Sequence, residues 1–358
     1  MSSEKIKHLR EEIDQLDQSF LKLLSQRGEK VMQIGQLKKA AQSRFHVPER
    51  EAKIFQKLKK NNPGPYKDEA ILSIFREILS ASLALESPLQ VAFLGPEATF
   101  THLAAIQRFG LSAQFVPQET IAQVFQAVQQ KKVNYGIVPI ENSTEGVVNH
   151  TLDLFVDFPL KICGEIKIAI VHNLLSQESD LRKIKKVYSH PHALAQCRQW
   201  LTKHLPQVKI VDVASTAKAA EIVSGEKQVA AIASEYAASK YKLKVLCKNI
   251  EDHPNNFTRF VVIGEEGCGP SGHDKTSLMF STKDEVGVLF KLLAPFAKEK
   301  INLTKIESRP LKGRAWEYIF FVDLDGHQED PKVRRAIETM AQSCSFLRVL
   351  GSYPKSEV

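Results

Sequence analysis

Apolar residues near the N-terminus recur at intervals of mostly three or four positions. They are Ile6, Leu9, Ile13, Leu16, Phe20, Leu23, Val31 and Ile34. This spacing places them on one stripe of a long helix, close to a heptad pattern. A second helix is predicted to open at Pro48, and a third carries Ile71, Phe75 and Ile78 on its inward face. Residues 1–87 therefore predict an all-helical domain.

Two cations interrupt the apolar stripe of the first helix, Arg27 and Lys38. Because unpaired buried charge is costly, they indicate either a buried anion site or, about equally, side chains that reach the surface. Arg10 flanks the stripe roughly 25 Å from Arg27 along a straight helix. No small ligand could contact both arginines of one chain. If both bind one substrate, Arg10 comes from an antiparallel second copy, which predicts a dimer.

Residues 90–264 show short apolar runs, each followed by a turn rich in hydroxyl groups and then by a helical pattern. Such turns hold Thr99 and Thr101, Ser143 and Thr144, Ser189, and Thr216. Strand, turn and helix in this order indicate an α/β domain, whose helix N-termini bind anions. One such turn is usually only a helix cap. Four favour a cleft for a small acidic molecule, although a transporter-type binding protein would show the same pattern.

A loop rich in glycine and proline at residues 264–272 precedes a third pattern. Residues 275–354 predict strands at 277–282, 303–309, 317–323 and 346–350, with helices at 286–300 and 331–343. The order β-α-β-β-α-β is that of the ferredoxin-like α+β fold. This fold hosts many functions, so it indicates little about function by itself. A multidomain protein with three kinds of domain is expected.

Composition narrows the classes of function. Hydrophobic residues make up 43% of the 358 residues and no apolar run has the length of a membrane span, so a cytoplasmic protein is expected. The net charge of +8 is spread along the chain, which disfavours nucleic acid and suits small acidic substrates. The five cysteines form no C-x-x-C pair, and His190 and His192 have no further ligand at metal spacing. No metal, cofactor, nucleic acid or membrane partner is expected.

Several strings in the helical part resemble the all-helical chorismate mutase family. They are Leu9-Arg10-Glu11-Glu12-Ile13, Arg27, Gly35-x-x-Lys38, Arg50-Glu51 and Ser82-x-x-x-Glu86. The resemblance implies an intertwined dimer that rearranges chorismate to prephenate, an isomerase reaction without a cofactor. It also implies substrate-binding roles for Arg10, Arg27, Lys38, Arg50, Glu51, Ser82 and Glu86.

Within that set, the two arginines Arg10 and Arg27 would hold the substrate carboxylates. Lys38 would stabilise charge on the ether oxygen as the C–O bond breaks. Glu86 could donate to the same oxygen only when protonated, so mutase activity is expected to fall as pH rises. Many family members have Asp where this chain has Val47, which removes one side-chain contact to the ring hydroxyl.

Four strings of the middle part resemble prephenate dehydratase. They are Gly95-Pro96-x-x-Thr99-Phe100, Pro139-Ile140-Glu141-Asn142-Ser143-x-x-Gly146, Ser189-His190-Pro191-x-x-x-x-Gln196-Cys197 and Asn256-x-Thr258-Arg259-Phe260. The resemblance implies a two-lobed fold like that of periplasmic binding proteins, with the site between the lobes. Thr258 would protonate the leaving hydroxyl as carbon dioxide departs. The implied substrate-binding set is Thr99, Thr101, Asn142, Ser143, Thr144, Ser189, His190, Gln196, Thr216, Asn256, Arg259 and Phe260. The chain has Ala98 where the family usually has Gly, a residue that reaches positive φ more easily.

The C-terminal part resembles the ACT domain, an amino-acid-sensing module. The strings are Gly287-Val288-Leu289 and Glu307-Ser308-Arg309-Pro310. The resemblance implies that phenylalanine binds there at a dimer interface and inhibits the dehydratase. Together the three resemblances predict a bifunctional enzyme of phenylalanine biosynthesis, with chorismate and prephenate as substrates. Two alternatives are that only one activity is retained, or that the chain is a non-enzymatic amino-acid sensor.

Overall fold

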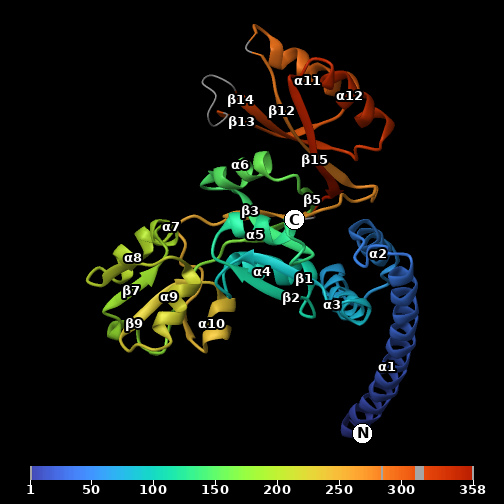
Figure 1. Cartoon of the computed structure of the whole chain (residues 1–358). Coiled ribbons are helices and arrows are strands. Elements are labelled where there is room, and N and C mark those ends of the chain that lie inside the picture. The colour runs from blue at the N-terminus through green and yellow to red at the C-terminus, as the bar shows by residue number, and fades with distance from the viewer. Residues whose placement is uncertain (1, 284, 311–317, 357–358) are drawn as a thin grey trace. The chain divides into compact units, whose positions relative to one another are not determined.

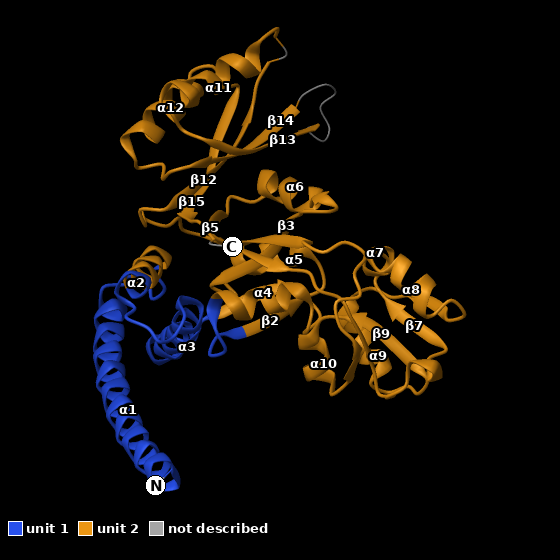
Figure 2. Ribbon diagram, turned by 180° about the vertical axis from the view of Figure 1, so that it is seen from behind, with its two compact units in different colours: residues 1–47, 58–89, 109–114 blue, residues 48–57, 90–108, 115–358 orange. Residues whose placement is uncertain are grey.

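The computed structural model describes residues 2–283, 285–310 and 318–356 (Figure 1). The chain divides into two compact units (Figure 2). The first comprises Met1–Val47, Leu58–Leu89 and Phe109–Gln114, and the second comprises Pro48–Lys57, Gln90–Arg108 and Phe115–Val358. The start of the second helix thus belongs to the second unit, whereas the sequence assigned all of residues 1–87 to one domain. None of the described helices is long and apolar enough to cross a membrane.

The first unit is built on two long helices, α1 (Ser2–Ala40) and α3 (Asp68–Glu86). Gly35 of α1 lies where a Cβ would meet the backbone and side chain of Glu86 at 3.2 Å, so the two helices approach closely there. The predicted apolar stripe of α1 remains open in a single chain: its residues from Ile6 to Leu23 are 48–68% exposed. Apolar area of this extent on one helix is typical of an interaction surface.

In the second unit, a mixed sheet of order β2-β1-β3-β11-β5 forms one lobe of an α/β domain, and β4 pairs with β3. The strands are β1 (Gln90–Leu94), β2 (Gln114–Gln118), β3 (Tyr135–Asn142), β4 (Gly146–Val147), β5 (Lys161–Ala169) and β11 (Phe257–Gly264). The helices are α4 (Phe100–Phe109), α5 (Ile121–Gln129) and α6 (Asn149–Asp157). Helix α2 (Pro48–Asn61) begins at a proline, as predicted.

A second lobe is inserted in the chain between β5 and β11. Its sheet has the order β10-β6-β9-β7-β8. The strands are β6 (Asn173–Ser176), β7 (Lys186–Ser189), β8 (Lys209–Asp212), β9 (Val229–Ala233) and β10 (Lys244–Cys247), and the helices are α7 (Pro191–Gln196), α8 (Arg198–His204), α9 (Thr216–Val223) and α10 (Glu235–Tyr241). Two buried apolar clusters fill the lobe, which therefore has a core of its own. The predicted two-lobed α/β architecture is confirmed.

The C-terminal part forms an antiparallel sheet of order β13-β14-β12-β15. Its elements are β12 (Asp274–Ser281), α11 (Val288–Lys298), β13 (Leu303–Pro310), β14 (Tyr318–Asp325), α12 (Pro331–Ala341) and β15 (Phe346–Pro354). The predicted β-α-β-β-α-β order is confirmed, and residue 317 of the predicted third strand lies outside the described residues. Helices α11 and α12 pack together with the sheet around a common core.

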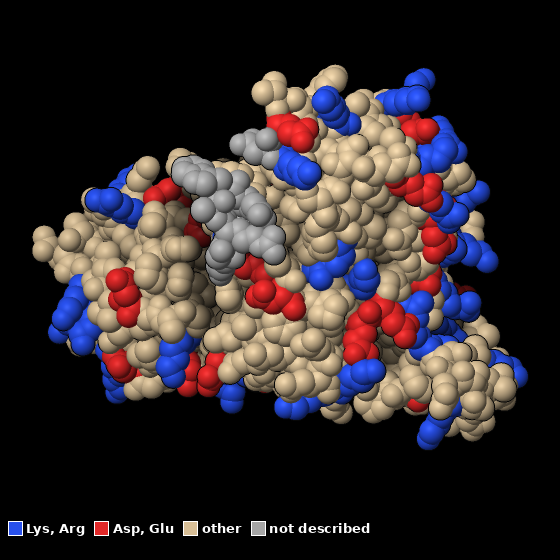
Figure 3. All heavy atoms as spheres, turned by 45° about the horizontal axis from the view of Figure 1, so that its top comes forward, with Lys and Arg blue, Asp and Glu red and all other residues tan. Residues whose placement is uncertain are grey.

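The C-terminal sheet touches the first lobe through β15 and β5. Gly351 of β15 leaves no room for a side chain, because a Cβ there would collide with the Ile162 backbone of β5. The Lys161 ammonium also donates to the Val349 carbonyl oxygen at 2.7 Å. On the face drawn in Figure 3, positive and negative side chains are interspersed and do not gather into a single patch of one sign.

Candidate active sites

A cavity of about 890 Å³ lies between the two lobes of the α/β domain. Its walls come from loops and helix starts of both lobes, as expected for a site between two α/β lobes. Seven of the thirteen residues predicted for the dehydratase site, Thr258 included, line it: Thr99, Thr101, Asn142, His190, Gln196, Thr216 and Thr258. Other lining residues were not predicted from the sequence, among them Gln118, Glu145, His172 and Lys218.

Thr258 and Asn142 are the centre of this cleft. They face each other on adjacent strands, β11 and β3, and the Asn142 Nδ2 donates to Thr258 Oγ1 at 2.8 Å. The Asn142 Oδ1 accepts from the backbone N–H groups of Thr144 and Glu145, both at 2.9 Å. This turn fixes the amide so that its NH2 group faces the threonine. The Thr258 hydroxyl proton then remains available to donate to a ligand.

A chain of side-chain hydrogen bonds leads from Asn142 across the cleft. Asn142 Nδ2 also donates to Asn256 Oδ1 at 2.8 Å, and Asn256 Nδ2 donates to Gln196 Oε1 at 3.1 Å. Gln196 Nε2 donates to Glu145 Oε1 at 2.8 Å, and Gln196 Oε1 lies 2.7 Å from His172 Nε2. Gln196 belongs to the second lobe and Asn142 to the first, so the network joins the two walls. Asn256 contributes to the site through these bonds.

Two histidines of the cleft, His172 and His190, have lowered pKa values. Burial lowers the pKa of His172, which is 2% exposed, and outweighs its hydrogen bond to Gln196. Burial also lowers the pKa of His190, whose side chain accepts from the His192 N–H at the start of α7. Both rings are therefore neutral at neutral pH. A neutral His172 donates from Nε2 to Gln196, which fixes the orientation of that amide.

Hydroxyl groups at the other predicted turns mostly satisfy the local backbone. Thr99 Oγ1 donates to the Pro96 carbonyl oxygen at 3.0 Å and accepts from the His102 N–H. Ser215 caps α9 by accepting from the Lys218 N–H at 3.0 Å, and Thr216 follows as the first residue of that helix. These bonds are the ordinary capping interactions. They place two helix starts, those of α4 and α9, at the wall of the cleft.

Six of the predicted dehydratase residues do not line the cleft. Ser189 is fully buried and donates to the Ile232 carbonyl oxygen at 2.7 Å, and Phe260 is buried in the core. Ser143 Oγ accepts from the Phe257 N–H at 2.9 Å, which closes the turn, and Thr144 is exposed. Asn256 acts through its hydrogen bonds, and Arg259 lines a different cavity.

Ala98, where the family usually has Gly, has φ +66° and is 1% exposed. Its N–H donates to the His102 Nδ1 at 3.1 Å. The turn that the sequence expected of a glycine is therefore formed by an alanine, at a cost of about 1–2 kcal/mol for a left-handed L-residue. The buried contacts of this residue with the second lobe's core offset part of that cost.

Four residues predicted for the mutase site meet in the first unit. The Arg27 guanidinium donates to Ser82 Oγ, and Lys38 Nζ lies 2.7 Å from Glu86 Oε2. The Lys38 ammonium also donates to the Phe45 carbonyl oxygen at 2.8 Å. Ser82 and Glu86 lie one turn apart on α3, so the two cations of α1 face α3 one after the other. Arg10 lies on an exposed part of α1.

The remaining two mutase residues, Arg50 and Glu51, belong to the second unit. Glu51 Oε1 lies 2.7 Å from the Nη1 of Arg108 in α4. Burial alone would lower the pKa of Arg108, but the Glu51 carboxylate outweighs burial and the pKa is raised. Arg50 is exposed. Among the described residues, no group of three or more His, Cys, Asp or Glu side chains could hold a metal ion.

The predicted effector residues lie at two places in the C-terminal domain. Gly287 has φ +74° and precedes α11, which begins at Val288. Val288 and Leu289 pack partly against the domain core, whereas Phe290 is 78% exposed. Glu307, Ser308, Arg309 and Pro310 form the end of β13. The Arg309 Nε donates to Asp153 of α6 at 2.9 Å, so this strand also contacts the first lobe.

Comparisons with known proteins match three successive parts of the chain to three families. Residues 9–87 match the family described as chorismate mutase type II, residues 91–268 match prephenate dehydratase, and residues 276–341 match the ACT domain. Relatives named bifunctional chorismate mutase/prephenate dehydratase are similar over nearly the whole chain. The chain therefore belongs to the family of bifunctional chorismate mutase/prephenate dehydratases.

Two of these relatives set the level of similarity. The bifunctional chorismate mutase/prephenate dehydratase of Aquifex aeolicus is 50% identical over 99% of this chain and 99% of that protein. The Pseudomonas aeruginosa protein of the same name is 44% identical over 99% of this chain and 98% of its own length.

Solved structures resemble the part after the first helices. The prephenate dehydratase of Arthrobacter aurescens in complex with L-Phe has a TM-score of 0.69 and 34% identity, covering 74% of this chain and 90% of that one. A structure described as a novel type of quorum quenching acylase has a TM-score of 0.68 and 31% identity, covering 75% of this chain and 98% of that one.

Proposed function

We propose that this chain rearranges chorismate to prephenate with its first helices and converts prephenate to phenylpyruvate, carbon dioxide and water in the interlobe cleft. The cleft itself carries the second half of the proposal. It presents a threonine hydroxyl, Thr258, whose oxygen accepts from Asn142 and whose proton is free. Relatives named for both activities and similar over 99% of the chain support the pairing of the two reactions.

In the dehydratase step, Thr258 acts as the general acid. Its proton passes to the ring hydroxyl, which leaves as water. The C–C bond to the ring carboxylate breaks at the same time, and its electron pair completes the aromatic ring as carbon dioxide departs. The Asn142 amide holds the threonine oxygen in place and stabilises the negative charge that develops on it. No cofactor is needed, because the reaction is redox-neutral and the leaving groups are already on the substrate.

The substrate carboxylates need hydrogen-bond donors other than the Thr258 hydroxyl, whose proton goes to the ring hydroxyl. The starts of α4 and α9, with Thr101 and Thr216, offer N–H and hydroxyl groups at the cleft wall. His190 and Gln196 stand on the same second-lobe wall as Thr216 and are fixed by their own hydrogen bonds. We assign these groups to orienting the substrate, so that the ring hydroxyl meets Thr258.

In the mutase step, Arg27 and Lys38 supply fixed positive charge. Arg27 would hold a substrate carboxylate with Ser82, and Lys38 would contact the ether oxygen, to which Glu86 could donate only when protonated. The reaction breaks one C–O bond and forms one C–C bond within a single molecule, so holding the reactive conformer is the main task. The second carboxylate would pair with Arg10 of a second copy. The exposed apolar stripe of α1 supports a dimer through that helix.

We also propose that phenylalanine regulates the chain through its ACT domain. The support is the family match at residues 276–341 and the similar dehydratase that was solved with L-Phe. Gly287, Val288 and Leu289 begin α11 beside the exposed Phe290 and Val286, an apolar surface that suits an effector site shared between two copies. Glu307, Ser308, Arg309 and Pro310 are the other expected contacts. A cytoplasmic location follows from this biosynthetic role.

The similarity to a structure described as an acylase does not carry over to this chain. One fold hosts several chemistries, so the residues of the site decide. An acylase needs a nucleophile bonded to a base. Here the Thr258 hydroxyl accepts a hydrogen bond from the Asn142 amide, which cannot act as a base.

One assay tests both activities. Purified protein is incubated with chorismate, and separately with prephenate, and both prephenate and phenylpyruvate are followed with and without phenylalanine. We expect prephenate to appear first and phenylpyruvate to follow. If prephenate alone yields no phenylpyruvate, the dehydratase proposal is wrong. If chorismate decays no faster than without protein, the mutase proposal is wrong.

A further inference from the structure

Neighbouring residues of β11 face opposite sides of the sheet. Thr258 points into the interlobe cleft, and its cross-strand neighbour Asn142 does the same. Arg259 comes next along the strand, and side chains alternate between faces in a strand. Its cross-strand neighbours Glu141 on β3 and Lys167 on β5 line the same second cavity as Arg259. Arg259 therefore cannot contact a ligand that Thr258 contacts on the other face.

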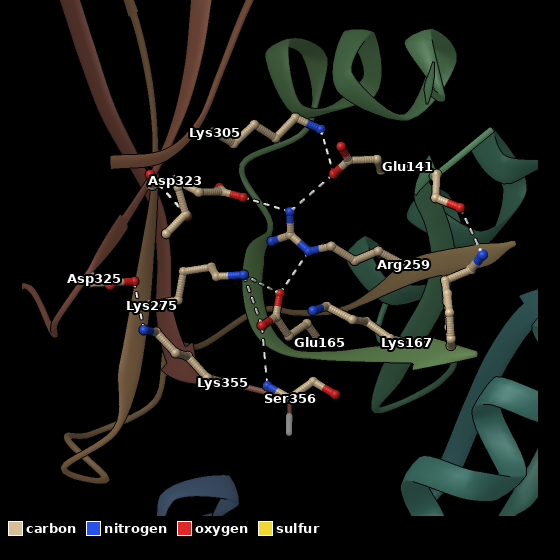
Figure 4. Close-up of a pocket in the computed structure, with 13 residues that line it drawn as sticks. Glu141, Glu165, Lys167, Arg259, Lys275, Lys305, Asp323, Asp325, Lys355 and Ser356 are labelled. Carbon is tan, nitrogen blue, oxygen red and sulfur yellow. Dashed lines mark hydrogen bonds and ion pairs between the residues drawn. The ribbon is translucent and has the colours of Figure 1, made fainter. Parts of the chain in front are cut away.

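This second cavity has a volume of about 480 Å³ and lies between the first lobe and the ACT domain. Figure 4 shows Arg259 at its centre, with carboxylates from both sides directed at the guanidinium. From the first lobe, Glu165 Oε2 accepts from Arg259 Nε at 2.7 Å. From the ACT domain, Asp323 Oδ2 accepts from Nη1 at 2.6 Å, and the Tyr353 hydroxyl accepts from Nη2 at 2.9 Å.

Further contacts hold these partners in place. Ser277 donates to Asp323 Oδ1 at 2.5 Å and lies 2.7 Å from the Tyr353 hydroxyl. The Lys275 ammonium donates to both oxygens of Glu165, at 3.0 and 2.9 Å. Arg259, Asp323 and Tyr353 are all buried. A guanidinium held on three sides at this depth has one orientation.

The electrostatics agree with a permanent pair. Burial alone would lower the pKa of Arg259, but Tyr353, Asp323 and Glu165 outweigh burial and raise it. Burial alone would raise the pKa of Asp323, but Arg259 outweighs it and the pKa is lowered. Losing one partner would leave the other buried and uncompensated, which is strongly unfavourable. The bond between the ACT domain and β11 therefore persists over the neutral pH range.

We infer that Arg259, Asp323 and Tyr353 are positioning residues for Thr258, through which the ACT domain holds the catalytic strand in register with the cleft. The inference rests on the proposed dehydratase activity. Thr258 directly precedes Arg259 in β11, so a shift of the guanidinium moves the threonine through the backbone. The ACT domain thus controls a reaction whose substrate its own residues never touch. An effector that binds the ACT domain could therefore act on Thr258 through the contacts of Asp323 and Tyr353 with Arg259, the next residue in the chain.

Two aspartates on β14 provide a matched test. Asp323 bonds to Arg259, whereas Asp325 lines the same cavity but pairs with Lys355 at 2.6 Å. Asp323→Asn and Asp325→Asn make the same change of charge in the full-length chain. For each, kcat and KM for prephenate are measured, together with mutase activity as an internal control for folding.

For Asp323→Asn we expect kcat to fall by about ten- to a hundredfold, because a small misplacement of a reacting group has effects of that size. KM should change by less than about twofold, as for loss of an interaction that matters only in the transition state. The Asp325→Asn and mutase values should equal those of the unmodified chain. Phenylalanine should also inhibit Asp323→Asn to a smaller extent, because the path from its site is broken.

Two further variants keep the test decisive. If Asp323→Asn loses mutase activity as well, the chain has not folded, and Tyr353→Phe, which removes one oxygen, replaces it with the same expected pattern. Arg259→Lys should lower kcat and leave KM nearly unchanged. An unchanged kcat in Tyr353→Phe and Asp323→Asn, or a rise in KM alone in Arg259→Lys, overturns the inference. An unmodified chain that makes no phenylpyruvate would instead refute the proposed function.

Discussion

The two candidate active sites differ in how much of each one chain supplies. Both walls of the cleft that holds Thr258 come from one chain, and hydrogen bonds from Asn142 to Gln196 join them. The mutase residues of α1 and α3 lie beside an apolar stripe that is 48–68% exposed from Ile6 to Leu23. Arg10 lies too far along the same helix to reach Arg27. We therefore expect one site to depend on folding alone, and the other to depend on folding and on association.

The sites also differ in chemistry. The mutase residues are charged, and Lys38 and Glu86 already form an ion pair without substrate. The groups bonded to Thr258 and its neighbours are instead mainly neutral amides, with two histidines kept neutral by burial, although Glu145 and Lys218 also line the cleft. Fixed charge suits a reaction in which negative charge develops on an ether oxygen, and neutral donors suit one that must deliver a proton. The predictions below test this contrast, from the largest effect to the smallest.

Thr258→Val should separate the two activities most sharply. The substitution keeps the shape of the side chain and removes the proton, so dehydratase kcat should fall by about 10²–10⁴, the usual range for a general acid. Mutase activity should be unchanged, because Thr258 belongs to a different domain. The measurement is the rate of phenylpyruvate formation from prephenate beside prephenate formation from chorismate. Dehydratase activity within tenfold of the unmodified chain would remove Thr258 from the acid role.

Arg10→Ala and Arg27→Ala test association at the mutase site. Each variant alone should lose mutase activity by at least about a hundredfold, the loss of a charge-assisted carboxylate contact. When the two are mixed and allowed to exchange chains, a symmetric dimer regains one intact site in each mixed pair. Roughly a quarter of the normal number of sites should return at random exchange.

The dehydratase rate provides the control for that mixture. It should be the same in both single variants and in the mixture, because the interlobe cleft needs no second chain. If mixing restores no mutase activity although chains have exchanged, Arg10 does not come from the partner. Chain exchange itself can be followed with a size-altering tag on one of the two variants.

Gly351→Ala should weaken the junction between the ACT domain and β5. A Cβ at this position would collide with the Ile162 backbone, and overpacking of this kind costs about 1–3 kcal/mol. We expect a lower melting temperature for the second unit and reduced inhibition by phenylalanine. Gly267→Ala, at a glycine whose Cβ would meet nothing within 4 Å, is the matched control and should change neither. Equal melting temperatures for the two variants would show that β15 and β5 can move apart to accept the methyl group without loss of stability.

The contrast between the two sites also explains what the sequence could predict. The apolar spacing of α1, the strand and turn order of the lobes and the β-α-β-β-α-β order were all predicted, because periodicity and turn residues are local signals. Cations on the α1 stripe were a local signal too. The string Asn256-x-Thr258-Arg259-Phe260 was read as one site, although the alternation of a strand separates Thr258 from Arg259.

Other parts of the sites depend on long-range contacts, which no local pattern carries. His172 lies outside every recognisable string and enters the cleft because Gln196, far along the chain, binds its ring. Glu145 could have been predicted as a lining residue, because it directly follows the predicted residues Ser143 and Thr144. Glu51 was expected at the mutase site, and its bond to Arg108 could not be foreseen, because Arg108 lies on a helix of another domain.

The smallest predicted effect concerns the neutral histidine of the cleft. Burial lowers the pKa of His172 below its ordinary value of 6.5, so the unfolded chain binds a proton that the folded chain resists. Stability is therefore unaffected well above pH 6.5 and is lost as the pH falls below it, by at most about 1.36 kcal/mol per pH unit. His172→Gln keeps a donor for Gln196 and cannot titrate. Its melting temperature should fall less steeply than that of the unmodified chain between neutral pH and the pKa of the folded state. Helices α1 and α3 of the mutase site lie in the first unit, so the pH dependence of mutase activity should be the same in His172→Gln and in the unmodified chain. If His172→Gln changed the pH dependence of mutase activity as well, the histidine would act on the whole chain and not on the cleft.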